Sequence, residues 1–183
     1  AGSGKSVAIG QKIIVRILKA MDKGKKHTFL CLRKTQPAAR KSIFPLFKDI
    51  IESWGLNKLC TINKTDMTIT FRGGCRIIIT GLDDPEKIKS IHGITSVWLE
   101  EVTEFTYDDF QQIDLRLRGF TWDYKQIALS FNPIDENHWL RKKVFTDEIQ
   151  KEIESGKQII DREYSQGLMV RRSNTPLRSC TLR

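Results

Sequence analysis

The sequence predicts an α/β fold in which a mostly parallel β-sheet is flanked by helices. Three observations support this prediction. Segments with apolar residues at helical spacing alternate along the chain with short, continuous apolar runs, which are typical of strands buried on both faces. A length of 183 residues and a hydrophobic content of 39% suit one domain with a real core. Between Cys60 and Leu82 the apolar residues alternate as in a β-hairpin or meander, so an antiparallel unit should interrupt the parallel sheet.

The first half of the chain contains four of the expected elements. Apolar residues at helical spacing over 6–21 predict a helix, which residues 22–26 end. The run HTFLCLR at 27–33 predicts a buried strand. Pro37 opens a second helix that reaches Trp54 and stops at Gly55. The antiparallel unit then follows, with Arg72, Gly73 and Gly74 at its connection.

The second half continues the alternation of helix and strand. Residues 83–91 predict a short helix, 95–101 a strand that ends in two carboxylates, and 105–118 a helix. A further strand is expected over 126–133, and a last helix begins in 136–145. Residues 163–183 lack apolar periodicity and read as a disordered or non-native tail, so the domain is expected to span residues 1–162.

Composition narrows the class of partner. The formal net charge of +9 favours a polyanion, although solvated basic faces would give the same charge. Five lysines most simply belong to such solvated faces, but they could instead form a DNA-facing patch: Lys23, Lys25, Lys26, Lys142 and Lys143.

The four cysteines form no CxxC pair, which argues against a zinc site or a disulfide framework. No apolar run approaches the roughly 20 residues of a membrane span, so a soluble, intracellular protein is expected.

The chain opens with AGSGKS, the second half of the pattern GxxxxGK[ST]. In such a loop the backbone N–H groups of Gly2, Ser3, Gly4 and Lys5 would face a phosphate, Lys5 would add charge, and Ser6 would ligate Mg²⁺. The first glycine of the pattern and the strand before it would fall ahead of residue 1. The chain is therefore expected to lack the first strand and, alone, to bind nucleotide weakly. A Gly/Ser-rich linker is the alternative reading of these residues.

The strand SVWLEE ends in Glu100 and Glu101. Hydrolysis by an activated water needs a metal ligand and a base, and side chains alternate along a strand, so the two carboxylates can do different work. We expect Glu100 to hold Mg²⁺ and Glu101 to polarise the attacking water. A solvated strand edge is the alternative.

Four segments follow one another along the chain: AGSGKS, FLCLRKTQPAARKSIFPLFKDII, IHGITSVWLEEVTEFTYDDFQQIDLRLRG and ALSFNPIDENHWLRKKVF. In this order they resemble the ATPase domain of phage terminase large subunits, especially the PBSX-like group, over about residues 1–160. The resemblance implies a P-loop NTPase fold of the RecA/ASCE type, with ATP and Mg²⁺ as cofactors. It also implies double-stranded DNA translocation during packaging, a homo-oligomeric ring, and a terminase small subunit and capsid portal as partners. The location implied is the cytoplasm of a bacterial host, at the procapsid portal.

The same resemblance assigns roles to particular residues. Ser130 and Asn132, followed by Pro133, occupy the place of the motif that senses the γ-phosphate and couples hydrolysis to DNA movement. Four basic residues complete the set, as possible nucleotide or DNA contacts (Arg33, Lys34) or as the arginine finger (Arg116 or Arg118).

Two departures from the family pattern affect what is expected. Ala1 stands where some terminases carry an arginine in the phosphate loop. No acidic nuclease cluster follows residue 133, so no nuclease activity is expected. A helicase-like or recombination ATPase, and an inactive, truncated prophage remnant that binds DNA weakly, remain as alternative functions.

Overall fold

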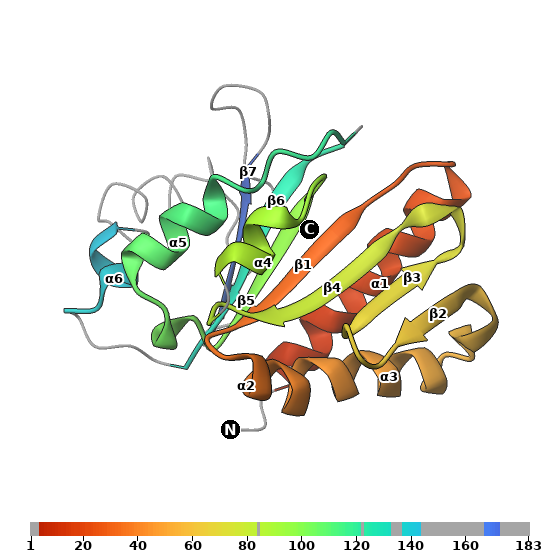
Figure 1. The fold of residues 1–183 in the computed structure, drawn as a ribbon, viewed down its shortest axis with the longest axis horizontal. Coiled ribbons are helices and arrows are strands. Elements are labelled where there is room, and N and C mark those ends of the chain that lie inside the picture. Colours follow the sequence, from red (N-terminus) through yellow and green to blue (C-terminus); the bar gives the residue numbers. More distant parts are fainter. Residues whose placement is uncertain (1–3, 84, 122, 133–136, 144–166, 173–183) are drawn as a thin grey trace, which may run out of the picture.

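The centre of the structure is a parallel sheet whose strands are apolar on both faces, as buried parallel strands must be. The computed structural model describes residues 4–83, 85–121, 123–132, 137–143 and 167–172 (Figure 1). Four parallel strands are adjacent in the order β4 (Arg76–Gly81), β1 (Thr28–Arg33), β5 (Ser96–Glu100) and β6 (Lys125–Ser130). Their carboxyl ends therefore meet along one edge of the sheet.

Antiparallel strands flank this parallel centre. β2 (Cys60–Asn63) pairs with β3 (Thr68–Phe71), which pairs with β4. The expected antiparallel unit is therefore present, and the prediction of an α/β sheet flanked by helices is confirmed. On the opposite side, β7 (Gly167–Arg172) pairs antiparallel with β6. These six residues belong to the segment 163–183, for which a disordered or non-native tail was expected, and the structure pairs them with β6.

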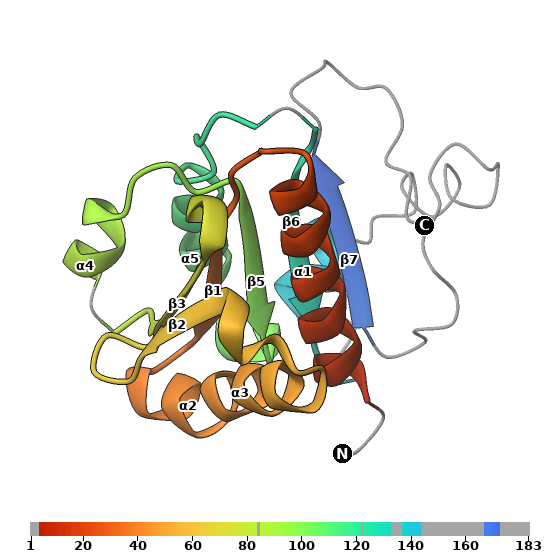
Figure 2. The same ribbon diagram turned by 90° about the vertical axis from the view of Figure 1, so that its right-hand side faces the viewer.

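Two helical layers cover the faces of the sheet (Figure 2). α1 (Lys5–Asp22), α2 (Gln36–Lys41) and α3 (Ile43–Ser53) pack on one face, where Phe47 meets Trp98 edge to face with ring centroids 6.1 Å apart. α4 (Pro85–Ser90), α5 (Tyr107–Asp114) and α6 (Trp139–Lys143) lie on the other face. Side chains of β1 alternate between the two cores, with Phe29 in the first and Leu30 in the second.

Short 3₁₀ helices lie in the described connections at Leu56–Leu59, Arg72–Gly74 and Val102–Glu104. Within the described residues, no helix is both long and apolar enough to cross a bilayer.

Two helices differ from the sequence prediction. The single helix expected from Pro37 to Trp54 is broken at Ser42. Pro45 explains the break, because its ring has no N–H and would clash with the carbonyl four residues earlier if one helix continued through. The helix expected over 105–118 is shorter, since α5 ends at Asp114. After α5 the chain turns back to the sheet, where Gly119 N donates to Ile94 O at 2.7 Å.

Candidate active site

α1 begins at the edge of the sheet where β1, β5 and β6 end. Gly4 is the residue before its first turn and has φ 69°, a left-handed conformation that glycine adopts without strain. Its carbonyl accepts from Ala8 N at 2.9 Å, which closes the first turn. The free N–H groups and the positive end of the helix dipole in this turn attract anions. Of the predicted phosphate loop, Gly2 and Ser3 lie outside the described residues.

Three of the predicted groups meet at this edge. Lys5 Nζ donates to Asn132 Oδ1 at 3.1 Å, and Asn132 Nδ2 lies 3.4 Å from Glu101 Oε2. Lys5 and Asn132 are 127 positions apart in the sequence, and Asn132 and Glu101 are 31 apart. The amide of Asn132 thus lies between an ammonium group and a carboxylate, and can bind both because it carries a donor and an acceptor.

Glu101 has an unusual backbone. It is the first residue after β5, and its φ of 52° and ψ of 57° place it in the left-handed region. For a residue with a Cβ atom this conformation costs about 1 kcal/mol or more. The conformation ends the strand pairing, begins the Val102–Glu104 turn, and separates the two adjacent carboxylates. Glu101 contacts Asn132, whereas Glu100 turns into the protein.

Glu100 is almost fully buried, with 7% of its surface exposed. Its Oε2 accepts from the hydroxyl of Ser42 at 2.7 Å and lies 3.5 Å from Arg33 NH1. Arg33 also reaches Glu104, with NH2 3.0 Å from Oε1. A buried carboxylate needs such partners, because burial without them is costly. Both of these contacts involve Oε2.

Ser42 was not predicted from the sequence. The signal that could have indicated it is the helix break before Pro45, which places Ser42 where two helices meet. Arg33 was predicted as a nucleotide or DNA contact, and the structure places its guanidinium between two carboxylates with a side-chain exposure of 16%. Its Nε is buried without a hydrogen-bond partner among the described residues. In this geometry Arg33 positions Glu100.

Ser130 lies in a different environment from Asn132. Ser130 is 3% exposed, and its hydroxyl accepts from the indole of Trp98 at 3.0 Å. The same hydroxyl donates to the carbonyl of Leu99 at 3.4 Å. These contacts tie β6 to β5, so the geometry favours Asn132 over Ser130 as the residue that meets the nucleotide. A sensing role for either residue stays a prediction.

The remaining basic candidates are placed less directly. Lys34 Nζ forms an ion pair with Asp109 Oδ2 at 2.6 Å. Burial alone would raise the pKa of Asp109, but hydrogen bonds from Lys34 and from Thr106, which begins α5, lower it overall. The two finger candidates follow α5 in a turn, with Arg116 half-buried and Arg118 exposed. The expectation that both lie within the helix predicted over 105–118 is wrong, because α5 ends before them.

The donor groups at this edge fit magnesium bound together with phosphate. Among the residues that the structure describes, no three His, Cys, Asp or Glu side chains form a metal cluster. Mg²⁺ commonly relies on one or two carboxylates, water and phosphate oxygens rather than on a cage of protein ligands. Glu100 supplies such a carboxylate, and Ser6, half-buried in the first turn of α1, supplies a hydroxyl.

Comparisons with known proteins agree on one family. The family model for the phage terminase large subunit matches residues 1–173. The PBSX phage terminase large subunit of Bacillus subtilis (strain 168) is 34% identical over 150 residues, which cover 82% of this chain and 33% of that protein. The chain therefore spans about a third of the length of this relative.

Solved structures of the large terminase from a thermophilic bacteriophage share the fold. Crystal form 2 has a TM-score of 0.61 at 20% identity, covering 85% of this chain and 36% of that chain. The same protein in complex with ATP-gamma-S has a TM-score of 0.59 at 22% identity, covering 82% and 35%. Its complex with ADP has a TM-score of 0.60 at 20% identity, covering 82% and 36%.

Proposed function

Because the chain belongs to the phage terminase large subunit family, we propose that it is an ATP-hydrolysing motor domain that converts hydrolysis into movement of double-stranded DNA. The observation that carries this proposal is the contact chain from Lys5 through Asn132 to Glu101. It joins the start of α1 to the ends of β6 and β5, where ligands of parallel α/β sheets bind. The large terminase of the thermophilic bacteriophage, whose fold is similar, has been solved with ATP-gamma-S and with ADP.

In this proposal Lys5 and the N–H groups at the start of α1 bind the phosphates. Glu100 and Ser6 would hold Mg²⁺, which would neutralise negative charge on the phosphates, while ATP would supply the phosphoryl group. Ser42 and Arg33 keep Glu100 in place in its buried site. Glu101 orients the attacking water and accepts its proton. Asn132 can exchange its contacts with Lys5 and Glu101 for contacts with the nucleotide.

The proposed DNA partner follows from the family and from the net charge of +9. A terminase small subunit, a capsid portal and a ring of identical subunits belong to the same proposal, as does action in the cytoplasm of a bacterial host. An arginine finger in such a ring would come from Arg116 or Arg118. Arg118 is the exposed one of the two, which favours it for reaching a neighbouring subunit.

The test is Glu101→Gln, which keeps the shape of the side chain and removes its ability to accept a proton. Phosphate release by the protein should fall at least about 100-fold, the usual contribution of a general base, while ATP binding is retained. Glu52→Gln on the exposed side of α3 is the matched control and should leave turnover unchanged. Unchanged turnover in Glu101→Gln would remove the catalytic assignment.

A further inference from the structure

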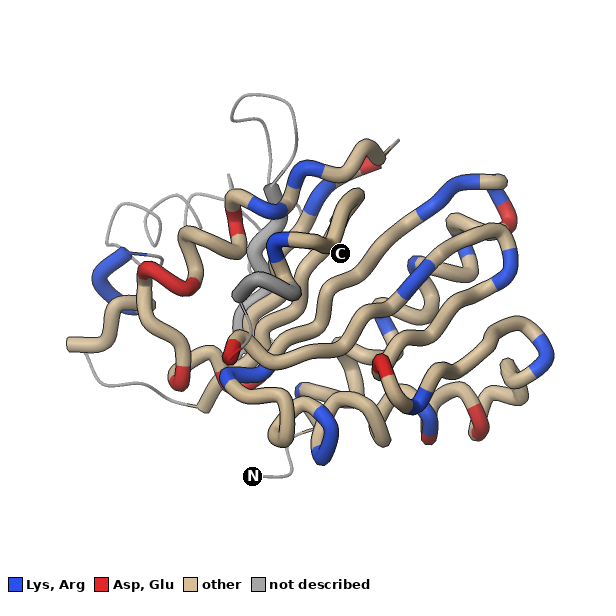
Figure 3. Tube along the Cα trace, in the orientation of Figure 1, with Lys and Arg blue, Asp and Glu red and all other residues tan. Residues whose placement is uncertain are grey.

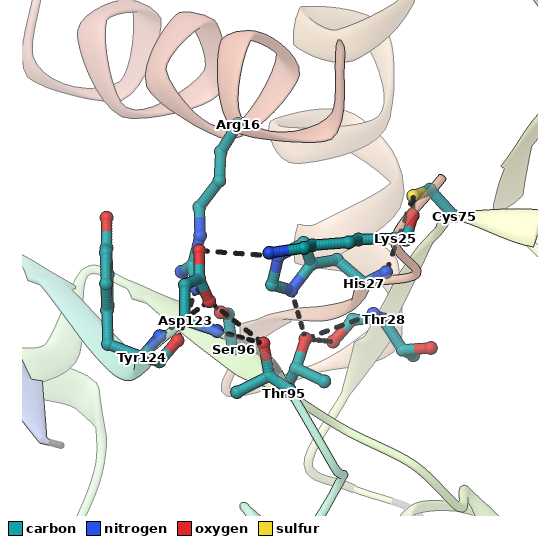
Figure 4. A network of polar contacts seen from close by, with 10 residues as sticks. Arg16, Lys25, His27, Thr28, Cys75, Thr95, Ser96, Asp123 and Tyr124 are labelled. Atoms are coloured by element: carbon teal, nitrogen blue, oxygen red, sulfur yellow. Dashed lines mark hydrogen bonds and ion pairs between the residues drawn. The ribbon is translucent and has the colours of Figure 1, made fainter. Parts of the chain in front are cut away.

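A second polar network lies at the opposite edge of the sheet, where β1, β5 and β6 begin (Figure 4). Arg16 reaches across from α1 to this edge. Its NH1 donates to Ser96 Oγ at 2.8 Å, and its NH2 donates to Asp123 Oδ1 at 2.8 Å and to the carbonyl of Tyr124. The guanidinium carbon lies 4.0 Å from the centroid of the Tyr124 ring, and the side chain is 10% exposed. Arg16 is therefore a buried cation with a fixed position.

Asp123 compensates that buried charge. Its Oδ2 lies 3.6 Å from Nε2 of His27, whose Nδ1 is 3.1 Å from Thr95 Oγ1. Burial alone would raise the pKa of Asp123, but hydrogen bonds from His27 and Arg16 outweigh burial and lower it. The carboxylate is thus committed to Arg16 and His27. Its charge offsets that of Arg16, so the charges of the surrounding lysines remain as the excess.

A hollow of about 560 Å³ lies beside this network. Its described lining includes five cations, namely Lys12, Arg16, Lys19, Lys23 and Lys25, but only one carboxylate, Asp123. Figure 3 shows basic residues gathered where α1 ends and β1 begins. The half-exposed side chains of Val15 and Trp54 add an apolar part to the wall. With Asp123 committed to its own partners, the lining carries a strong net positive charge.

The spacing of these cations fits an extended polyanion. Lys12, Lys19 and Lys23 are separated by seven and four positions, so they follow one face of α1 and its C-cap residue, Lys23. Eleven residues of helix rise about 16 Å, and each strand of B-DNA carries one phosphate per about 3.4 Å of axis. A row of this length therefore runs beside a stretch of duplex in which each strand carries about five phosphates. A compact anion would meet only part of it.

We propose that this basic groove, defined by Lys12, Lys19, Lys23 and Lys25 beside the paired Arg16 and Asp123, binds the phosphate backbone of double-stranded DNA without reading its sequence. The inference rests on the proposed motor function and assigns the DNA to a particular surface. The groove cations begin at Lys12, about 10 Å along the helix from Lys5, and continue past the end of α1, which is about 27 Å long for 18 residues. One rigid helix would thus contact both the nucleotide and the DNA.

The test is the double variant Lys19→Glu and Lys23→Glu, at an exposed position on α1 and at its exposed C-cap. Binding of a 30-base-pair duplex should weaken at least tenfold at low salt. The slope of log K against log salt should become less steep by about 2, because each lost phosphate contact contributes about 0.9. The matched control is Lys58→Glu with Lys64→Glu, which changes the net charge equally at exposed positions outside the groove. Its salt slope should stay near that of the wild type.

Each outcome decides the proposal. ATP binding and melting temperature should be unchanged in both double variants, which separates loss of the groove from loss of the fold. The assignment of DNA to this groove would be overturned if both double variants weakened DNA binding equally, or if the salt slope of the groove variant were unchanged. The motor proposal would still stand in that case, provided that the wild-type protein binds DNA. Wild-type protein that fails to bind duplex even at low salt would overturn both proposals. If the groove variant kept duplex binding but lost binding to a polyglutamate peptide, the groove would belong to an acidic protein partner instead.

Discussion

Replacing Asp123 with asparagine tests the network that ties α1 to the starts of the strands. The carboxylate accepts hydrogen bonds from Arg16 at 2.8 Å, from the Thr121 hydroxyl at 2.9 Å and from the Tyr124 amide at 2.6 Å. Asparagine keeps the shape and one acceptor oxygen but removes the charge. The buried cation Arg16 would then lack its ionised partner.

The size of the effect follows from these contacts. A hydrogen bond to a charged group contributes about 1.5–3 kcal/mol, against about 1 kcal/mol for a neutral pair, and breaking a buried ion pair costs more. The side chain of Asp123 is 39% exposed, so solvent screens part of this difference. At pH 7 the Asp123→Asn variant should lose about 1–2 kcal/mol of unfolding free energy.

The loss should depend on pH in a defined direction. The network lowers the pKa of Asp123 in the folded protein, so its stabilisation is fully present above the unfolded value of about 3.9. It is lost as the pH falls below that value toward the folded pKa, by up to about 1.4 kcal/mol per pH unit. At pH 3 the difference between variant and wild type should therefore be about 1 kcal/mol smaller than at pH 7.

Urea unfolding at pH 7 and pH 3 measures this difference directly. The change from aspartate to asparagine at exposed Asp49 in α3 is the matched control and should show a small effect at both pH values. A destabilisation by Asp123→Asn that is the same at both pH values would refute the assignment of an ionised, stabilising carboxylate. No destabilisation at pH 7 would refute the network itself.

Three further predictions address packing, the buried carboxylate and the thiols. Gly81→Ala should cost at least about 2 kcal/mol in urea unfolding, because the added Cβ would lie 2.0 Å from the backbone nitrogen of Gln36. Arg33→Met should destabilise the fold by about 3 kcal/mol, because Glu100 would lose its cation while buried; stability equal to wild type would show that Ser42 alone suffices. Cys31 should react with a thiol reagent only after unfolding, since burial and then the nearby Glu100 charge raise the pKa of its thiol, and rapid labelling of folded protein would contradict this.

The functional edge could be predicted from the sequence because parallel strands all end on the same side of the sheet. Residues that follow two apolar strands, such as Glu101 and Asn132, must then lie near each other and near the start of the first helix. The roles of Ser42 and Arg33 could not be read in this way. Their contacts with Glu100 depend on how the α2–α3 connection packs, which no local pattern in the sequence fixes.

Other differences had weaker signals or none. Residues 168–170 form a short apolar run that could have indicated β7, but its length gave no reason to pair it with β6. The network around Arg16 joins residues 107 positions apart, and an arginine on a helix face is usually solvated. The burial of Arg16 depends on how α1 packs against the sheet. After α5 the chain turns back to the sheet, where the amide of Gly119 donates a hydrogen bond to the carbonyl of Ile94. This is a tertiary contact, which the local sequence does not indicate.

If Glu101 acts as the proposed base, its left-handed backbone sets catalysis against stability at one position. Glycine would adopt φ 52° without the steric penalty that glutamate incurs, so the fold alone would favour glycine there. Retaining glutamate means that the protein holds a strained residue for the sake of its carboxylate. Selection of variants for thermal stability alone should therefore recover glycine or asparagine at this position, and the variants recovered should be more stable and unable to turn over ATP.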